Sequence, residues 1–212
     1  MPFDSLYQLR EYQVQTVYKQ FAVSFKDDDL YCTLYEDEVK RTKFLLYFFK
    51  HYIKLIERYC YFVADSEECN SVMIVFDSKK ESKFYVVRAL WFNIKIMIVL
   101  VRLRSLKGIR HMLALWDMFT SRWVNDFVNK DYYHMDLLYT KKSHQGQGLA
   151  STLIRSLLET ADEEHCDVTM ETHHKDNLSL YEHVGFKQMG MVRHEQYQVT
   201  QYNLLYRSKE VE

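Results

Sequence analysis

Turn-forming and cross-linking residues are scarce in this sequence. Its 212 residues include one Pro, five Gly and four Cys. So few Pro and Gly, beside 48% hydrophobic and 16% aromatic residues, exclude a linker-rich or disordered chain. The cysteines show no paired spacing such as C-x-x-C, which favours reduced thiols over a disulfide framework. We therefore expect an ordered globular protein of the cytoplasm.

An excess of charge of either sign is also missing, since the formal net charge is -1. No global positive field exists to attract nucleic acid or an anionic membrane, and we expect neither as a partner. The basic run Arg102, Arg104, Lys107 and Arg110 is read as a solvated helix face, with its role left open. The start of the chain lacks the pattern of a secretory signal.

A long uninterrupted hydrophobic run is absent as well. The most apolar segment, residues 84–103, contains Arg88, Lys95 and Arg102, and charge at the centre of a membrane span is costly. It is predicted to be a buried or partly buried helix. The His165–Cys166 and His173–His174 pairs fit no common zinc-ligand spacing, so we expect no metal.

Hydrophobic periodicity predicts a single domain, 1–212, with a helical insertion at about 80–129. Helices are expected at 9–25, 36–58, 90–103 and 112–128, with Gly108 as the break between the last two, and a hairpin at 61–65 and 72–76. Then follow a strand at 132–139, a helix at 149–161, a strand at 166–172, a helix at 177–184, and strands at 186–191 and 201–207. This order predicts an α/β (α+β) fold: a mixed sheet flanked by helices, with strands 132–139 and 166–172 forming a parallel pair.

The most informative segment opens the helix at 149. Gly146 and Gly148 allow a sharp turn and leave no Cβ to block a ligand, while the helix directs unpaired N–H groups at the same place. Such a turn attracts phosphate.

At this point the sequence resembles the GCN5-related N-acetyltransferases (GNAT). Its Q/R-x-x-G-x-G/A pattern is matched by Gln145, Gly146, Gln147, Gly148, Leu149 and Ala150. A second family pattern, N-x-x-x-Y-x-x-x-G-F, is matched from Asn177 through Tyr181 to Gly185 and Phe186. Residues 21–41 and the insertion look like the puromycin-type and fungal branch, although Asp29 and Lys142 stand where that branch usually has Pro.

The resemblance implies that acetyl-CoA is the cofactor and assigns roles to residues. The strand end at Leu138, Tyr139 and Thr140 would bind the pantetheine arm, with the Leu138 N–H as oxyanion donor. The pyrophosphate would be held by Gln145, Gly146, Gln147, Gly148, Leu149, Ala150 and Ser151. Asn177 would contact the cofactor or cap its helix, and Tyr181 would protonate the leaving thiolate.

The general base is less constrained. A lysine-like amine has a pKa of roughly 10.4, so a base must remove a proton before the nitrogen attacks. Glu171 is ranked first, and Asp136 and His134 are alternatives that share one face of the preceding strand.

Taken with the resemblance, the sequence predicts an N-acetyltransferase that moves an acetyl group from acetyl-CoA directly to a primary amine, most simply of a small molecule. The alternatives are a non-catalytic acyl-CoA-binding module and a protein N-terminal or lysine acetyltransferase. The partners expected are acetyl-CoA and an amine acceptor, and a homodimer stays open.

Overall fold

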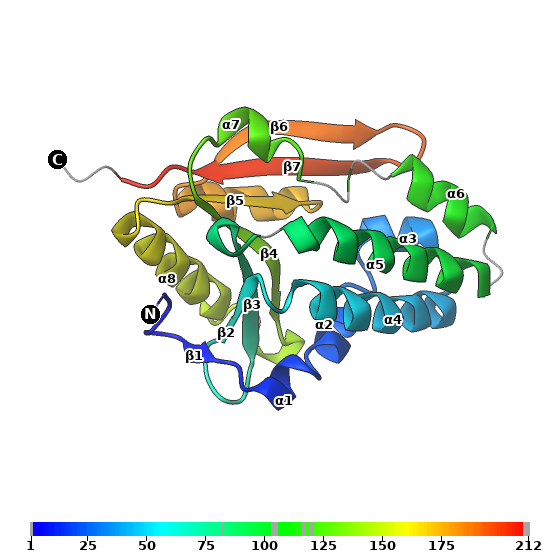
Figure 1. Ribbon diagram of the computed structural model, residues 1–212, viewed down its shortest axis with the longest axis horizontal. Helices are drawn as coiled ribbons and strands as arrows, with labels where there is room; N and C mark the ends of the chain where they lie inside the picture. Colours follow the sequence, from blue (N-terminus) through cyan, green and yellow to red (C-terminus); the bar gives the residue numbers. More distant parts are fainter. Residues whose placement is uncertain (1, 82, 103–105, 116–117, 119–120, 210–212) are drawn as a thin grey trace.

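The computed structural model describes residues 2–81, 83–102, 106–115, 118 and 121–209. Seven strands form one sheet in the order β1-β2-β3-β4-β5-β7-β6 (Figure 1). Its strands are β1 (Tyr7–Gln8), β2 (Cys60–Ala64), β3 (Ser71–Asp77), β4 (Tyr132–Thr140), β5 (Asp167–Thr172), β6 (Lys187–His194) and β7 (Val199–Tyr206). Only β4 and β5 pair in parallel among these strands, which confirms the predicted mixed, mostly antiparallel sheet.

Helices from the first half of the chain cover one face of the sheet. They are α1 (Glu11–Val14), α2 (Tyr18–Ser24), α3 (Asp29–Leu34), α4 (Glu38–Ile56), α5 (Lys83–Arg102) and α6 (Leu106–Ala114). In α4 the spacing of Phe44, Leu45, Phe48 and Phe49 gives one apolar face, which is buried with Ile74, Leu137 and Tyr139 of the sheet. Asp37 begins this helix by accepting a hydrogen bond from the Lys40 N–H at 2.9 Å.

The opposite face is covered by α8 (Leu149–Glu163) and α9 (Leu178–His183). Leu153, Ile154 and Leu157 of α8 are fully buried against sheet residues, as the predicted amphipathic pattern requires. Helix α8 therefore has a fixed position, with its N-terminus at the end of β4 (Figure 1).

Some sequence predictions of the helices were wrong. The helix expected at 9–25 is two short helices, α1 and α2, because the chain turns between them, and β1 and α3 were not predicted. Gly108 does not break the insertion, since it lies inside α6. The helix expected at 112–128 is also interrupted: α6 ends at Ala114, and α7 (Val124–Phe127) follows a turn.

The hairpin, the strands after residue 131 and the helices α8 and α9 were predicted correctly to within a few residues. Asn177 ends a short 3-10 turn, Lys175–Asn177, and no capping hydrogen bond of its side chain is found, so the capping interpretation is not supported. All four cysteines are free. Within the described residues, no helix is long and apolar enough to cross a membrane.

Candidate active site

The site forms where two neighbouring parallel strands separate. Strands β4 and β5 pair from Tyr132 and Asp167 only as far as Met135 and Met170, although β4 continues to Thr140. The register with β3 shifts at the same level: Val75 is opposite Met135, Ile74 is opposite Leu137, and Asp136 is the extra residue of a β-bulge. The bulge turns the end of β4 away from β5 and opens the sheet.

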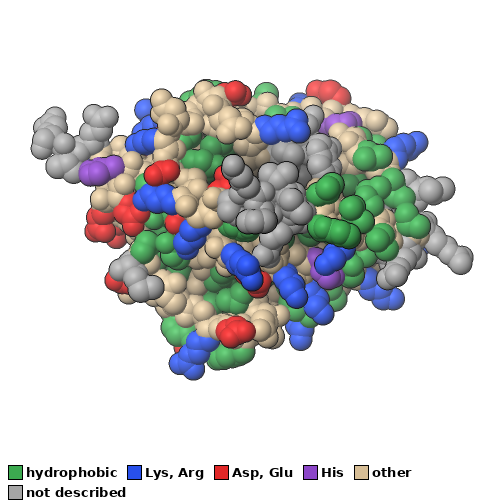
Figure 2. Space-filling model, viewed as in Figure 1, with side chains coloured by type: hydrophobic (Ala, Val, Ile, Leu, Met, Phe, Trp, Pro, Cys, Tyr) green, Lys and Arg blue, Asp and Glu red, His purple; other side chains and the backbone are tan. Residues whose placement is uncertain are grey.

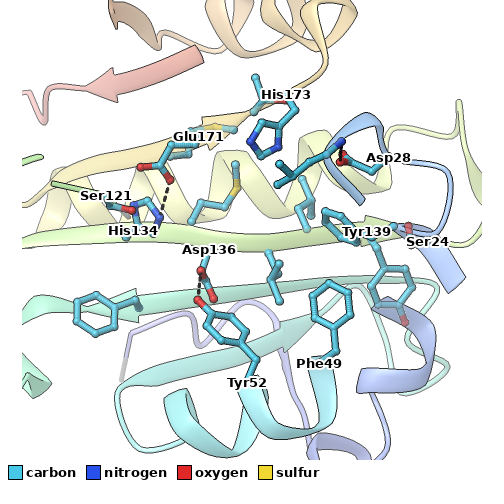
Figure 3. Close-up of a pocket in the computed structure, with 18 of the residues that line it drawn as sticks. Ser24, Asp28, Phe49, Tyr52, Ser121, His134, Asp136, Tyr139, Glu171 and His173 are labelled. Carbon is cyan, nitrogen blue, oxygen red and sulfur yellow. Dashed lines mark hydrogen bonds and ion pairs between the residues drawn. The ribbon is translucent and has the colours of Figure 1, made fainter. Parts of the chain in front are cut away.

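A cavity of about 1260 Å³ fills this opening. It is lined by the end of β4, by β5, by the first turn of α8, by α9, and by the inner faces of α4 and α5. It therefore joins the glycine turn to the acid and histidine side chains at the strand ends. Figure 3 shows this region between β4, β5 and α4.

The glycine turn has the geometry that the sequence predicts. Gly146 and Gly148 have φ of 77° and 79°, in the left-handed region that other residues rarely adopt. Gly148 is the N-cap of α8 and no side chain caps that end, so the first N–H groups of the helix are left for a ligand. A Cβ at either glycine would meet no atom within 4 Å, because the turn faces open space.

Most of the residues predicted to hold the cofactor line this cavity. They are Leu138, Tyr139, Thr140, Gln145, Gly146, Gly148, Leu149, Ala150, Ser151, Asn177 and Tyr181. Gln147 is not among the lining residues; its side chain donates to the Ser143 carbonyl at 3.4 Å. The Gln145 amide reaches the Thr140 carbonyl at 3.4 Å, which ties the turn back to the end of β4.

The main chain at the end of β4 presents an unpaired edge. The Lys141 N–H donates to the Asn70 carbonyl at 2.7 Å, next to the registered pair Ser71 and Thr140. Because the bonding direction alternates along a strand, the main-chain groups of Leu138 and Thr140 face away from β3 and toward the opening. An extended ligand could pair with this edge as an added strand would.

A hydrogen-bonded group joins β4 to β5 above the opening. Glu171 lies 3.1 Å from Nε2 of His134, whose Nδ1 is 2.9 Å from the Thr169 hydroxyl. Trp123 donates from its indole N–H to the other Glu171 oxygen at 2.5 Å. Trp123 belongs to the insertion, at the start of α7, so the insertion contacts the site directly.

The charges of this pair support each other. Burial alone would lower the pKa of His134, but the Glu171 carboxylate and its hydrogen bond outweigh burial and raise it. Burial alone would raise the pKa of Glu171. The charge of His134 and the hydrogen bonds from His134, Trp123 and Ser121 lower it by more, so the net shift is downward. Both partners favour the ionised form, and Glu171 is a poor proton acceptor while this pair is intact.

Asp136 lies in a different environment. Its Oδ1 accepts a hydrogen bond from the Tyr52 hydroxyl of α4 at 2.7 Å, and among the described residues its buried Oδ2 has no hydrogen-bond partner (Figure 3). Burial raises the pKa of Asp136 to about 6, while His134 and the Tyr52 hydrogen bond act to lower it. The bulge thus places in the cavity lining a carboxylate whose second, buried oxygen has no hydrogen-bond partner among the described residues.

Tyr181 is buried on α9 and lines the same cavity. Its ring packs edge-on against Phe186 with centroids 6.1 Å apart. Burial raises the pKa of its hydroxyl to about 12, so the group keeps its proton at neutral pH.

Several lining residues were not identified from the sequence. Tyr52 is one of them; Trp123 does not line the cavity but donates to Glu171, which does. Neither residue carries a motif, and their contacts depend on the tertiary packing of α4 and of the start of α7. Asp28 also lines the cavity; it caps α3, and its carboxylate lies 3.0 Å from Nε2 of His174. The aromatic wall of the cavity comprises Phe25, Tyr31, Phe48, Phe49, Tyr52, Phe76, Phe92 and Tyr132.

Comparisons with known proteins agree with this geometry. Residues 113–186 match the model of the acetyltransferase (GNAT) family. The solved histone acetyltransferase HPA2 and related acetyltransferase from Corynebacterium glutamicum has a TM-score of 0.62 at 14% identity, with 97% of each chain covered. Arylalkylamine N-acetyltransferase 2 from Aedes aegypti has a TM-score of 0.61 at 11% identity and covers 96% of this chain and 98% of its own. A search among curated proteins found no match.

The matched segment contains the glycine turn and the Tyr181 helix, and the solved structures share the fold. Residues 113–186 are therefore similar to the acetyltransferase (GNAT) family, and the chain as a whole shares the fold of the solved acetyltransferases. The comparisons do not support the narrower resemblance to the puromycin-type branch.

The phosphate turn can be tested by Gly148→Ala. An L-residue at φ of 79° costs about 1–2 kcal/mol, so the turn should move and weaken CoA binding by about tenfold. Isothermal titration with CoA measures this, and Gly190→Ala is the control, because that glycine lies on β6 and a Cβ there meets no atom within 4 Å. Equal affinity of Gly148→Ala and the parent protein would exclude the turn as the diphosphate site.

Proposed function

We propose that this protein is an N-acetyltransferase that moves the acetyl group of acetyl-CoA to the primary amine of a small aromatic molecule. The observation that supports this most is a single cavity in which the glycine turn, the open edge of β4 and the Asp136 carboxylate meet. A thioester held along that edge would lie beside a base, as direct transfer to an amine requires.

The cofactor contacts follow from the turn and the strand edge. The N–H groups of residues 148–151 would receive the diphosphate, where the helix dipole also favours negative charge. The pantetheine amides would pair with the main chain at Leu138 and Thr140, beyond the last β4–β5 pair. The acetyl group would then reach the level of Leu138, whose N–H is the proposed oxyanion donor.

The acceptor chemistry follows from the rest of the cavity. Phe25, directly after α2, and aromatic rings of α3, α4 and α5 form one wall, and Asp28, Asp136 and Glu171 supply carboxylates. An aromatic ring would pack against the first and a cationic amine would be attracted by the second. Two structural relatives are named arylalkylamine N-acetyltransferases of Aedes aegypti, and that name specifies the same substrate class.

In the proposed reaction Asp136 accepts a proton from the bound ammonium, and the free amine attacks the thioester carbonyl. The Leu138 N–H stabilises the oxyanion of the tetrahedral intermediate. Loss of the second nitrogen proton and cleavage of the C–S bond give the amide, and Tyr181 protonates the departing thiolate. The balance is one amide, one free CoA thiol and one proton released.

The choice of base differs from the sequence ranking. Glu171 was placed first, but its ionised pair with His134 and its bond from Trp123 occupy both oxygens. Asp136 lines the cavity, has a pKa of about 6, and has one oxygen with no partner among the described residues, so this oxygen is not already engaged and its pKa is near the working pH. We therefore favour Asp136, with His134 and Glu171 setting its electrostatic surroundings.

The function is tested by following thiol release with acetyl-CoA and a panel of amines. Aromatic ethylamines should be turned over with a higher kcat/KM than aliphatic polyamines of similar charge, since only they fill the aromatic wall. A preference for peptides bearing a free N-terminus or a lysine would favour the protein-acetyltransferase alternative. Thermal stabilisation by CoA without any thiol release would identify a binding module.

The base is tested by Asp136→Asn and Glu171→Gln in parallel. Asp136→Asn should lower kcat/KM by about 10²–10⁴-fold and abolish the acidic limb of the pH profile near 6. Tyr52→Phe removes a hydrogen bond that lowers the Asp136 pKa, so the limb should move to higher pH. If Glu171→Gln loses the limb and Asp136→Asn keeps it, Glu171 is the base instead.

The acid is tested by Tyr181→Phe, which removes one hydroxyl from a buried ring. The transfer rate should fall by about 10²-fold or more, while the Kd for CoA changes little, because the hydroxyl acts only on the departing thiolate. Single-turnover kinetics separate the two quantities. Wild-type rates in this variant would remove Tyr181 from the mechanism.

A further inference from the structure

The outward side of α5 exposes a row of large apolar side chains. Their exposed fractions are Leu90 61%, Trp91 61%, Ile94 42%, Ile98 45% and Val101 60%. Residues 90, 94, 98 and 101 follow the helical repeat, so they form one stripe of about 17 Å along the helix. Leu113 of α6 is 61% exposed as well. Figure 2 shows apolar side chains gathered over α5 and α6. We call these six residues the α5–α6 apolar face.

The inner side of α5 already has a role that does not require this face. Phe92, Ile96 and Met97 line the cavity, and Ile96 and Val99 are buried in the core. The outer residues contribute to neither. An exposed apolar patch of this extent beside polar residues is typical of a contact surface.

The charged residues of the helices at this face are almost all basic. Apart from Glu38, the first residue of α4, every Asp, Glu, Lys or Arg position in the sequence of α4, α5 and α6 is Lys or Arg. Lys50, Lys95 and Arg110 are exposed. Figure 2 shows basic side chains next to the apolar cluster. The near-zero total charge conceals this segregation.

A small groove lies between α4 and α5 at the edge of the apolar face. Its volume is about 180 Å³, and it is lined by His51, Lys54, Leu55, Trp91, Phe92 and Lys95. Burial lowers the pKa of His51, and the nearby charges of Lys95, Lys50 and Lys54 lower it further. The groove is thus lined by basic side chains and by the exposed indole of Trp91.

Exposed apolar side chains together with basic charge allow three possible partners of the α5–α6 apolar face to be compared. A second copy would bring two acid-free, basic faces together, and like charges repel. A nucleic acid would meet the lysines but would leave Leu90, Ile94 and Ile98 in contact with polar phosphate and sugar. An anionic bilayer satisfies both features, because apolar side chains and Trp enter the interfacial layer while Lys meets the headgroups.

We infer that the α5–α6 apolar face docks on an anionic phospholipid surface, with Lys50, Lys95 and the groove beside Trp91 meeting the headgroups. This would be peripheral binding through the side of a helix and not insertion of a span. It also revises the expectation, based on net charge alone, that no membrane takes part. Since the inner side of the same helix lines the acceptor cavity, the docked surface would lie one helix away from the acceptor.

Vesicle co-sedimentation tests this independently of catalysis. The full chain should bind vesicles of phosphatidylcholine with about 30% phosphatidylserine at low salt, and lose most of that binding at about 0.5 M salt. Lys50→Glu with Lys95→Glu should weaken binding at least about 30-fold, since each basic residue near the surface contributes about fivefold. Trp91→Ser with Ile98→Ser should weaken it about tenfold or more.

Matched controls keep the charge and polarity changes but move them elsewhere. Lys19→Glu with Lys187→Glu makes the same charge change on α2 and β6, and Met191→Ser with Val192→Ser replaces exposed apolar residues of β6. Both controls should bind vesicles like the parent, and all variants should have the parent's melting temperature.

Three results would overturn the inference. They are absence of binding to anionic vesicles, equal binding to phosphatidylcholine alone, and loss of binding that is the same in test and control variants. Self-association in solution that Trp91→Ser with Ile98→Ser abolishes, without vesicle binding, would assign the face to a second copy. Thiol release with a soluble amine, measured without vesicles, should be unchanged in the test variants, so a failure here is separate from a failure of the proposed function.

Discussion

One extra residue in β4 is the constraint on which the site depends. Because Asp136 is bulged between Met135 and Leu137, β4 leaves β5 directly after their last paired residues. The same bulge shifts the alternation of side chains. His134 and Asp136 contact groups of the site, and Leu137 and Tyr139 then join the core under α4, while Met135 packs on the α8 side. The opening, the unpaired strand edge and the buried carboxylate therefore share a single origin.

The negative charge of the buried Asp136 carboxylate must be stabilised by neighbouring groups, because burial disfavours the charged form. The Tyr52 hydroxyl and the positive charge of His134 act in that direction, and burial still wins by enough to hold the Asp136 pKa near 6. The Glu171 carboxylate raises the pKa of His134 in turn, and Trp123 of the insertion donates a hydrogen bond to Glu171. The acid–base properties of one residue thus depend on α4, β5 and α7 together, and packing of the insertion is coupled to the chemistry.

The two halves of the fold differ in how far the sequence predicts them. The elements after residue 131 have strong local signals: alternation in β4, one apolar face in α8, and a glycine pair at the position that needs φ near 79°. Their order alone requires a parallel crossover. The cofactor side of the cavity could therefore be located from local patterns, and Gln147 is the one predicted contact that does not line it.

The acceptor side could not be predicted in the same way. Tyr52 and Asp28 line the cavity, and Trp123 contacts its Glu171, because α4, α3 and α7 pack at particular positions, and no periodicity gives that information. The bulge was missed for a related reason, since it depends on the register between β3 and β4 and not on the composition of either strand. Gly108 illustrates an error of the opposite kind. Glycine has a weak local preference for ending a helix, which predicted a break there, but the residue lies within α6.

Helix α5 carries apolar residues on both its inner and its outer side. A helix that is apolar almost all round is normally buried on every side in a globular fold. Here only the inner half is covered: it lines the cavity, and Leu90, Trp91 and Ile98 on the outer half are left exposed. A single exposed Leu or Ile needs no explanation, but a continuous stripe of them does. The outer half combines such a stripe with helices whose charged positions within residues 39–56, 83–102 and 106–114 are all Lys or Arg, and this combination has to be explained by what the surface meets.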